Sequence, residues 1–113
     1  MEKFIYLFRG GTDTHKSAEE RQAHMQKWFQ WMQNLSQTGN FVGGDPLTGK
    51  GKQLSGSKKV LTDGPFTEAK ECVGGYVIVN ANDIDHAVEM AKGCPIFENE
   101  GHLEVRPIAK RDM

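Results

Sequence analysis

The chain has 113 residues, of which 37% are apolar and 13 are glycine, a composition that excludes disorder of the whole chain. Its length fits one domain over residues 1–113, because domains commonly run to about 100–150 residues. Lys and Arg number 14 against 15 Asp and Glu, and this formal net charge of −1 argues against a nucleic-acid-binding protein.

The first predicted elements are a buried strand over residues 3–9 and a helix that begins at Ser17. The strand is rich in aromatic and β-branched residues. Ser17 and Glu20 have the spacing of a capping box, in which the Ser17 hydroxyl accepts from the amide three residues on. Apolar side chains at spacings of three and four then predict a helix face packed on a sheet, and the helix ends at Gly39. These side chains are Met25, Trp28, Phe29, Met32 and Leu35.

The middle of the chain predicts a short strand and a hairpin. The short strand covers residues 41–44 and opens into a turn-rich stretch over residues 45–51. Two weak strands, over residues 53–54 and 58–62, flank residues 55–57 and form the hairpin. Lysines protect its exposed edge, and we interpret them as solvated rather than as a phosphate-binding track. They are Lys50, Lys52, Lys58 and Lys59.

The last predicted elements are a central strand over residues 74–79, a helix capped within residues 82–85 and ended near Gly93, and a strand over residues 101–108. This order predicts an α+β ferredoxin-like sandwich, an antiparallel sheet with two helices on one face. The other face of the sheet stays uncovered, so we expect a symmetric homodimer, in which a second copy buries it.

Several classes of site and location are not supported by any segment of the sequence. No apolar run approaches the ~20 residues that cross a bilayer, and the charged start is unlike a signal peptide. Cys72 and Cys94 stand alone, which predicts two reduced thiols rather than a disulfide or a metal site. No glycine-rich phosphate motif or nucleophile elbow is present, so we expect no cofactor. The predicted protein is cytoplasmic, with no membrane partner.

His24 is the candidate acid or base. It lies on the shoulder of the apolar stripe, on the same side of the helix as Trp31, where an imidazole is half buried at the mouth of a cleft. A histidine there can accept or donate a proton near neutral pH. The alternative is a packing histidine bonded to a backbone carbonyl.

Residues 63–71 hold four ionisable groups and are the second candidate. Asp63 could orient a histidine, and Glu68 and Lys70 project to the same side if the segment is extended. The alternative is a solvated turn. On the last strand, Arg106 is either an anchor for an anionic ligand or a surface charge.

The nine residues at positions 63–71, Asp-Gly-Pro-Phe-Thr-Glu-Ala-Lys-Glu, are followed by Gly-Gly-Tyr at positions 74–76. With Gly-Gly-Asp-Pro-Leu at positions 43–47 and Glu-Val-Arg-Pro-Ile at positions 104–108, they make the chain similar to the YCII-related family, in its DGPF-domain branch. The resemblance implies a dimeric α/β barrel of ferredoxin-like subunits.

The resemblance also implies two kinds of function. Some members are proposed to be enzymes because a histidine near the first helix and an aspartate share a cleft, and His24 resembles that histidine. Related members place the acid just after the first helix, where this chain has Thr-Gly-Asn at positions 38–40, so Asp63 or Asp45 would serve. Members of this branch also resemble proteins encoded with sigma factors, which suggests a regulatory role.

Our leading hypothesis is therefore a homodimeric, cofactor-free acid–base enzyme with a small-molecule cleft. His24 would exchange the proton, Asp63 would orient it, and Lys70 or Arg106 would hold an anionic group. The rivals are a ligand-sensing or sigma-factor-associated module that uses residues 63–71, and a purely architectural motif. The predicted ligand-binding residues are Trp31, Phe66, Glu68, Lys70, Tyr76 and Arg106.

Overall fold

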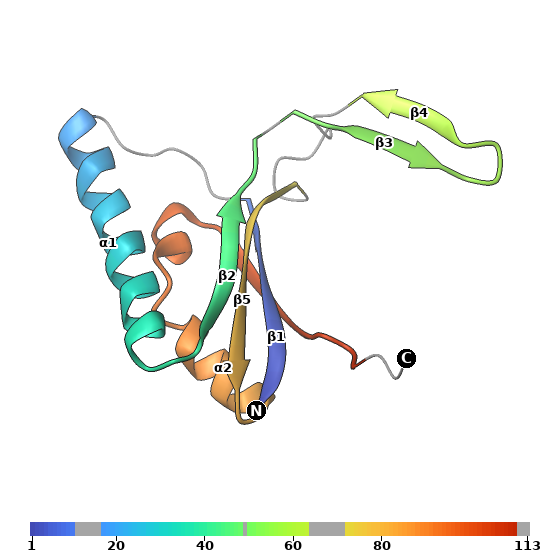
Figure 1. Cartoon of the computed structure of the whole chain (residues 1–113). Helices are drawn as coiled ribbons and strands as arrows, with labels where there is room; N and C mark the ends of the chain where they lie inside the picture. Colours follow the sequence, from blue (N-terminus) through green and yellow to red (C-terminus); the bar gives the residue numbers. More distant parts are fainter. Residues whose placement is uncertain (11–16, 49, 64–71, 111–113) are drawn as a thin grey trace.

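The structure, a computed structural model of the chain, describes residues 1–10, 17–48, 50–63 and 72–110 (Figure 1). Its elements follow the predicted order, with one addition, a short 3-10 helix, η2, before the last strand. They are β1 (Glu2–Arg9), α1 (Ala18–Gln37), β2 (Phe41–Pro46), β3 (Lys52–Ser55), β4 (Val60–Asp63), β5 (Val73–Ala81), α2 (Ile84–Ala91), η2 (Pro95–Asn99) and β6 (His102–Pro107).

The main sheet has four strands in the order β2-β5-β1-β6, and every neighbouring pair is antiparallel. The helices α1 and α2 lie on one side of it (Figure 1). The predicted α+β ferredoxin-like sandwich is therefore confirmed. No helix among the residues that the structure describes is long and apolar enough to span a membrane.

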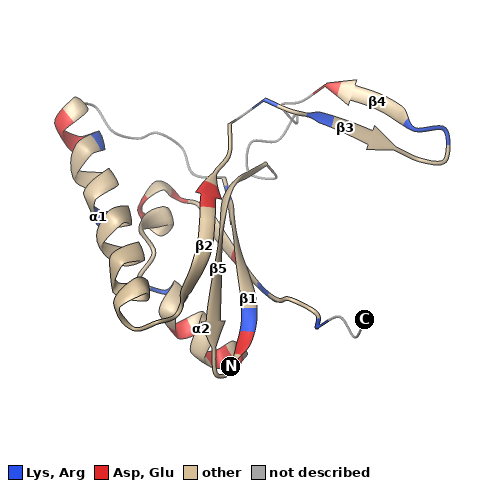
Figure 2. Cartoon of the chain, in the orientation of Figure 1, with Lys and Arg blue, Asp and Glu red and all other residues tan. Residues whose placement is uncertain are grey.

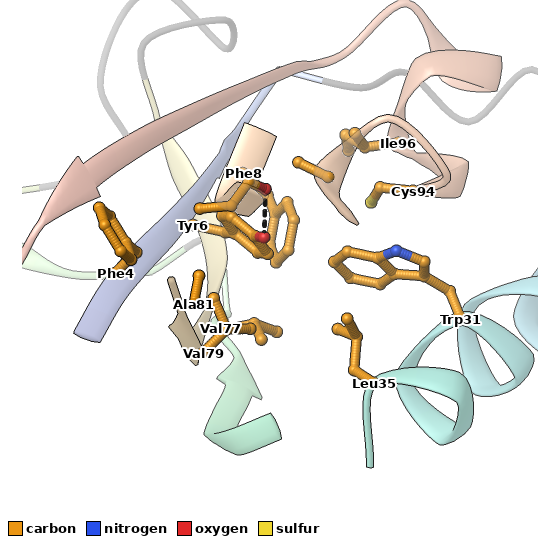
Figure 3. Close-up of a cluster of buried hydrophobic side chains, with 12 residues drawn as sticks. Phe4, Tyr6, Phe8, Trp31, Leu35, Val77, Val79, Ala81, Cys94 and Ile96 are labelled. Atoms are coloured by element: carbon orange, nitrogen blue, oxygen red, sulfur yellow. Dashed lines mark hydrogen bonds between the residues drawn. The ribbon is translucent and has the colours of Figure 1, made fainter. Parts of the chain in front are cut away.

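The core lies between this sheet and the helices (Figure 3). Alternate residues of β1 and β5 point into it, because successive side chains of a strand face opposite sides. The Tyr6 hydroxyl, buried with them, donates to the carbonyl oxygen of Ala87 at 2.5 Å and joins β1 to α2. Burial raises the pKa of Tyr6 to about 12. The residues of β1, β5 and α1 that form the core include Phe4, Tyr6, Phe8, Val77, Val79, Trp31 and Leu35.

The buried face of α1 differs from the predicted one. Met25 and Phe29 were expected in the core but are 67% and 70% exposed, whereas His24 and Trp31 are buried. The predicted stripe is thus rotated, and that part of the prediction is wrong. The large Trp31 ring packs on Tyr6 at a centroid distance of 5.9 Å, and this contact sets which side of α1 meets the sheet.

The predicted hairpin is confirmed as a separate two-stranded sheet of β3 and β4, which we call the arm (residues 52–63). In Figure 1 it extends from the end of β2 away from the helix layer. All eight strand residues of the arm are exposed. The turn between the strands uses Gly56 and Lys59, both at positive φ, of 75° and 55°.

Candidate functional site

His24 is the centre of a polar cluster between α1 and η2, and its residue is 9% exposed. The His24 Nδ1 lies 3.2 Å from Oε2 of Glu98. Its Nε2 lies 3.0 Å from Nε1 of Trp28 and 3.2 Å from Nδ2 of Asn99. The Nζ of Lys27 donates to the other Glu98 oxygen, Oε1, at 2.9 Å. We call these five residues the His24 cluster.

These hydrogen bonds fix which ring nitrogen of His24 carries the proton. The indole N–H of Trp28 can only donate, so the neutral imidazole must accept it at Nε2. The ring proton then sits on Nδ1 and is donated to the Glu98 carboxylate. A carboxylate that holds Nδ1–H in this way leaves Nε2 as the basic atom.

Glu98 is the negative charge of the cluster. The hydrogen bond from Lys27 lowers the pKa of the Glu98 carboxyl below its usual value, burial opposes the shift, and the hydrogen bond from His24 lowers it further. Glu98 is therefore ionised at neutral pH. It can stabilise an imidazolium on His24, although its 47% exposed side chain weakens the effect through solvent screening.

Local sequence positions both halves of the cluster. The Oγ of Ser17 accepts from the Glu20 amide at 3.2 Å, which caps α1 as the capping pattern predicts. Pro95 opens η2, a position that suits its fixed φ. At the other end, a Cβ on Gly101 would lie 2.5 Å from Cγ1 of Ile96, so a larger residue there would displace Ile96. These features define the ends of α1 and η2, the two elements that carry the cluster.

A shallow, open groove of about 510 Å³ runs beside the cluster, between α1 and the segment from α2 to η2. Lys27 and Glu98 from the cluster line it, together with Trp31 and Lys92. Trp31 itself is fixed, because its Nε1 donates to the carbonyl oxygen of Met90 at 3.0 Å. The groove therefore has an aromatic wall and charges of both signs.

Asp63, the predicted partner of His24, lies elsewhere in the subunit. It ends β4 on the arm, its side chain is 81% exposed, and its Oδ1 lies 3.9 Å from Nζ of Lys52. The arm extends away from α1 (Figure 1), so one subunit does not bring Asp63 and His24 together. The carboxylate beside His24 is instead that of Glu98, which the sequence analysis did not single out.

Of the other predicted ligand-binding residues, Trp31 lines the groove, whereas Tyr76 and Arg106 belong neither to the groove nor to the His24 cluster. Tyr76 lies on the helix-free face of the sheet, and its hydroxyl donates to Oδ2 of Asp45 at 3.0 Å. Arg106 is 65% exposed on β6, with its Nε 3.7 Å from Oε2 of Glu104. Phe66, Glu68 and Lys70 lie outside the described residues.

Sequence reasoning missed Glu98 and Asn99. The stretch after Gly93 shows no periodicity, so the sequence predicted only a helix stop followed by a strand. The single usable signal was Pro95, which suits the first turn of a new helix as well as the region after an old one. Nothing in the sequence connects Glu98 to His24, which lies 74 residues earlier. Within the described residues, no group of three or more His, Cys, Asp or Glu side chains could hold a metal ion.

The sheet order and the helices on one face define a ferredoxin-like α+β protein with a buried, carboxylate-paired histidine. The chain belongs to the YCII-related domain family, whose model matches residues 6–111. Among curated proteins, none is similar in sequence to this chain.

A solved structure with the same fold is 5-chloro-2-hydroxyhydroquinone dehydrochlorinase (TftG) from Burkholderia phenoliruptrix AC1100, in complex with 2,5-dihydroxybenzoquinone. The two chains are 16% identical, the match covers 92% of this chain and 90% of that chain, and the TM-score is 0.50. At this identity the likeness shows the fold alone.

Proposed function

We propose that the protein is a small, cofactor-free enzyme that transfers a proton to or from an organic molecule, with His24 as the acid or base. The observation that carries the proposal is the 3.2 Å contact between Nδ1 of His24 and Oε2 of Glu98. His24 itself is only 9% exposed. A proton taken up at Nε2 turns the ring into an imidazolium, which the Glu98 carboxylate stabilises. Glu98 thus replaces Asp63 as the proposed partner within one subunit.

The reaction requires one rearrangement of the cluster. In the structure, Nε2 accepts the indole N–H of Trp28 at 3.0 Å. The Nδ2 of Asn99 also lies 3.2 Å from this atom. A substrate proton can reach Nε2 only if the substrate takes the place of these groups. Lys27 and Lys92 line the adjoining groove and can attract an anionic substituent of the substrate. Lys70 and Arg106 stay predictions for the same role.

The fold likeness to TftG supplies a probe reaction. Dehydrochlorination removes a proton and a chloride ion from one molecule, and in our proposal the proton goes to Nε2 of His24 while the chloride leaves to water. We would measure chloride release from 5-chloro-2-hydroxyhydroquinone, and binding of 2,5-dihydroxybenzoquinone, for the wild type and for His24→Gln, Glu98→Gln and His102→Gln. His102 is an exposed histidine on β6 and serves as the matched control.

General acid–base catalysis contributes roughly 10²–10⁴-fold, so His24→Gln should lower the rate at least about 100-fold. Glu98→Gln keeps the shape but removes the charge, and should lower the rate less. His102→Gln should retain the wild-type rate. A His24→Gln variant with an unchanged rate would exclude His24 as the catalytic group.

A second candidate function, a non-catalytic ligand-binding or regulatory module, is favoured by a specific observation. Nε2 of His24 already accepts from Trp28 and lies 3.2 Å from Nδ2 of Asn99, as expected for a structural network. Under this hypothesis the wild type binds 2,5-dihydroxybenzoquinone in the groove without turnover of the chlorinated probe. The sigma-factor association stays a prediction of this second candidate.

We also propose that the protein is a cytoplasmic homodimer joined through the helix-free face of the main sheet. Ile5 and Ile78 are direct partners on that face, beside the pair of Leu7 and Tyr76. All four are only half buried, and no described element of the chain covers this face. Burial of such a face against a copy of itself is the simplest arrangement with closed symmetry.

A further inference from the structure

We infer that the arm, residues 52–63, packs on a second copy of this chain, with Leu54 and Leu61 as its contact residues. The inference rests on the homodimer proposed above and adds a second interface to the sheet face. Leu54 and Leu61 are directly opposite each other in the β3–β4 register and share one face of the arm. They are 67% and 56% exposed in the single chain.

The arm has too little structure of its own to be stable alone. Each strand has four residues, and all eight are exposed. An isolated two-stranded hairpin is at best marginally stable in water, and it becomes stable when a further surface covers its apolar face. The Leu54–Leu61 pair is the apolar face that such a surface would cover.

The position of the arm indicates which surface this is. The arm follows β2, an edge strand of the main sheet, and in Figure 1 it extends away from the helix layer. A body packed on the helix-free face of the sheet therefore lies next to the arm. Facing sheets are about 10 Å apart, and each four-residue strand of the arm is about 13 Å long, so the arm is long enough to reach the partner sheet.

The interface area also favours an arm contact. With strands about 4.8 Å apart and a rise of about 3.3 Å per residue, the flat outline of a four-stranded face of this length is roughly 450 Å². A stable dimer usually buries about 800 Å² of accessible surface per partner. Each subunit both gives one arm and receives one, so two arm contacts add their accessible surface to that of the sheet face.

Charge identifies the partner's body, rather than its arm, as the surface contacted. The arm holds three lysines against the single carboxylate of Asp63, so two arms repel each other. Figure 2 shows the basic segments of the arm in blue and the acidic end of β4 in red. The arm therefore packs on the partner's body rather than on the partner's arm. The lysines are Lys52, Lys58 and Lys59.

The test is the dimer dissociation constant from sedimentation of the wild type, a Leu54→Ser/Leu61→Ser double variant and a Val60→Ser control. Val60 precedes Leu61 on β4, so it lies on the opposite face of the same arm, and it is 55% exposed. We expect the dimer dissociation constant of the double variant to be at least about tenfold higher than that of the wild type, and that of Val60→Ser to stay within about threefold. Only the double variant removes the proposed contact of Leu54 and Leu61 with the partner. Unchanged thermal unfolding of the three proteins at a concentration where all are monomeric would show that the body stays folded.

The remaining outcomes separate this inference from the homodimer proposal. A wild type that stays monomeric at all concentrations overturns both. A wild-type dimer that the double variant leaves unchanged overturns the arm contact alone and keeps the sheet interface. Equal weakening by the double variant and by Val60→Ser also overturns it, because then the particular face of the arm is not what matters.

Discussion

At the scale of single residues, the charge on Glu98 depends on its neighbours in the His24 cluster. The hydrogen bond from Lys27 is the largest cause of the lowered pKa of the Glu98 carboxyl. Lys27→Met should therefore raise this pKa toward the ordinary value of about 4.3. A ¹³C NMR titration of the Glu98 carboxyl measures it. Lys92→Met is the control, because Lys92 lines the same groove but pairs with Glu89 at 2.7 Å.

The sign of the pH effect follows from the lowered pKa. Glu98 contributes stability above its unfolded-state pKa, and that contribution is lost as the pH falls through its lower native pKa. Lys27→Met should accordingly reduce the acid sensitivity of unfolding that is due to this residue. An identical Glu98 titration in the wild type and Lys27→Met would show that the 2.9 Å contact does not persist in solution.

The two cysteines should differ in reactivity. Cys94 is 4% exposed, and burial raises the pKa of its thiol from 9.0 to about 12. Cys72 is partly exposed. Because the thiolate is the reactive form, iodoacetamide at pH 8 should label one cysteine of the folded protein and both cysteines of the unfolded protein, as counted by mass spectrometry. Cys72→Ser should abolish labelling of the folded protein, and persistent labelling would place Cys94 in contact with solvent.

At the scale of elements, a hydrogen bond from the Tyr6 hydroxyl links β1 to α2. Tyr6→Phe removes its hydrogen bond to the Ala87 carbonyl and leaves a buried oxygen without that donor, at a cost of about 1 kcal/mol in the free energy of unfolding. Urea denaturation measures this. Tyr76→Phe is the control, with all proteins measured at a concentration where they are monomeric, because the bond from Tyr76 to Asp45 is exposed in the single chain and its loss should change stability by less than about 0.5 kcal/mol.

The same two tyrosines should both titrate above the ordinary pKa of tyrosine, for different reasons. The hydrogen bond to Asp45 raises the pKa of Tyr76 above 10.0, while burial raises that of Tyr6 to about 12. The neutral Tyr6 phenol stabilises the fold below its unfolded-state pKa, and the contribution disappears as the pH rises toward 12. The absorbance of tyrosinate should therefore rise in a last step that coincides with the alkaline unfolding of the protein. In Tyr6→Phe that last step should be missing.

The sequence predicted elements where side-chain periodicity was strong and failed where it was not. Aromatic and β-branched residues predicted β1 and β5 as strands. Residues 4–8 and 76–79 are apolar at every position, so the sequence did not say which alternate side chains face the helices. In α1, Met25, Phe29 and Trp31 are all apolar, so the pattern could not say which side meets the sheet. Glu98 sits in η2, too short for any periodicity to show, and its contact with His24 exists only through the tertiary fold.

At the scale of the whole molecule, the helix-free face of the sheet should determine the oligomeric state. In a dimer with two-fold symmetry, one substitution on this face occurs twice in the interface. Ile78 lies at its centre, opposite Ile5 on β1, so Ile78→Lys would place an unpaired charge at each of two buried positions. A buried, unpaired charge costs several kcal/mol, which corresponds to a dimer at least about 100-fold weaker.

Sedimentation of Ile78→Lys measures this directly, and Ile84→Lys is the matched control. Ile84 is 45% exposed at the start of α2, on the helix side of the molecule. A lysine there stays in water and should leave the dimer intact. If Ile84→Lys dissociated the dimer and Ile78→Lys did not, the helix layer would be the interface. The half-buried apolar face of the sheet would then need a different occupant.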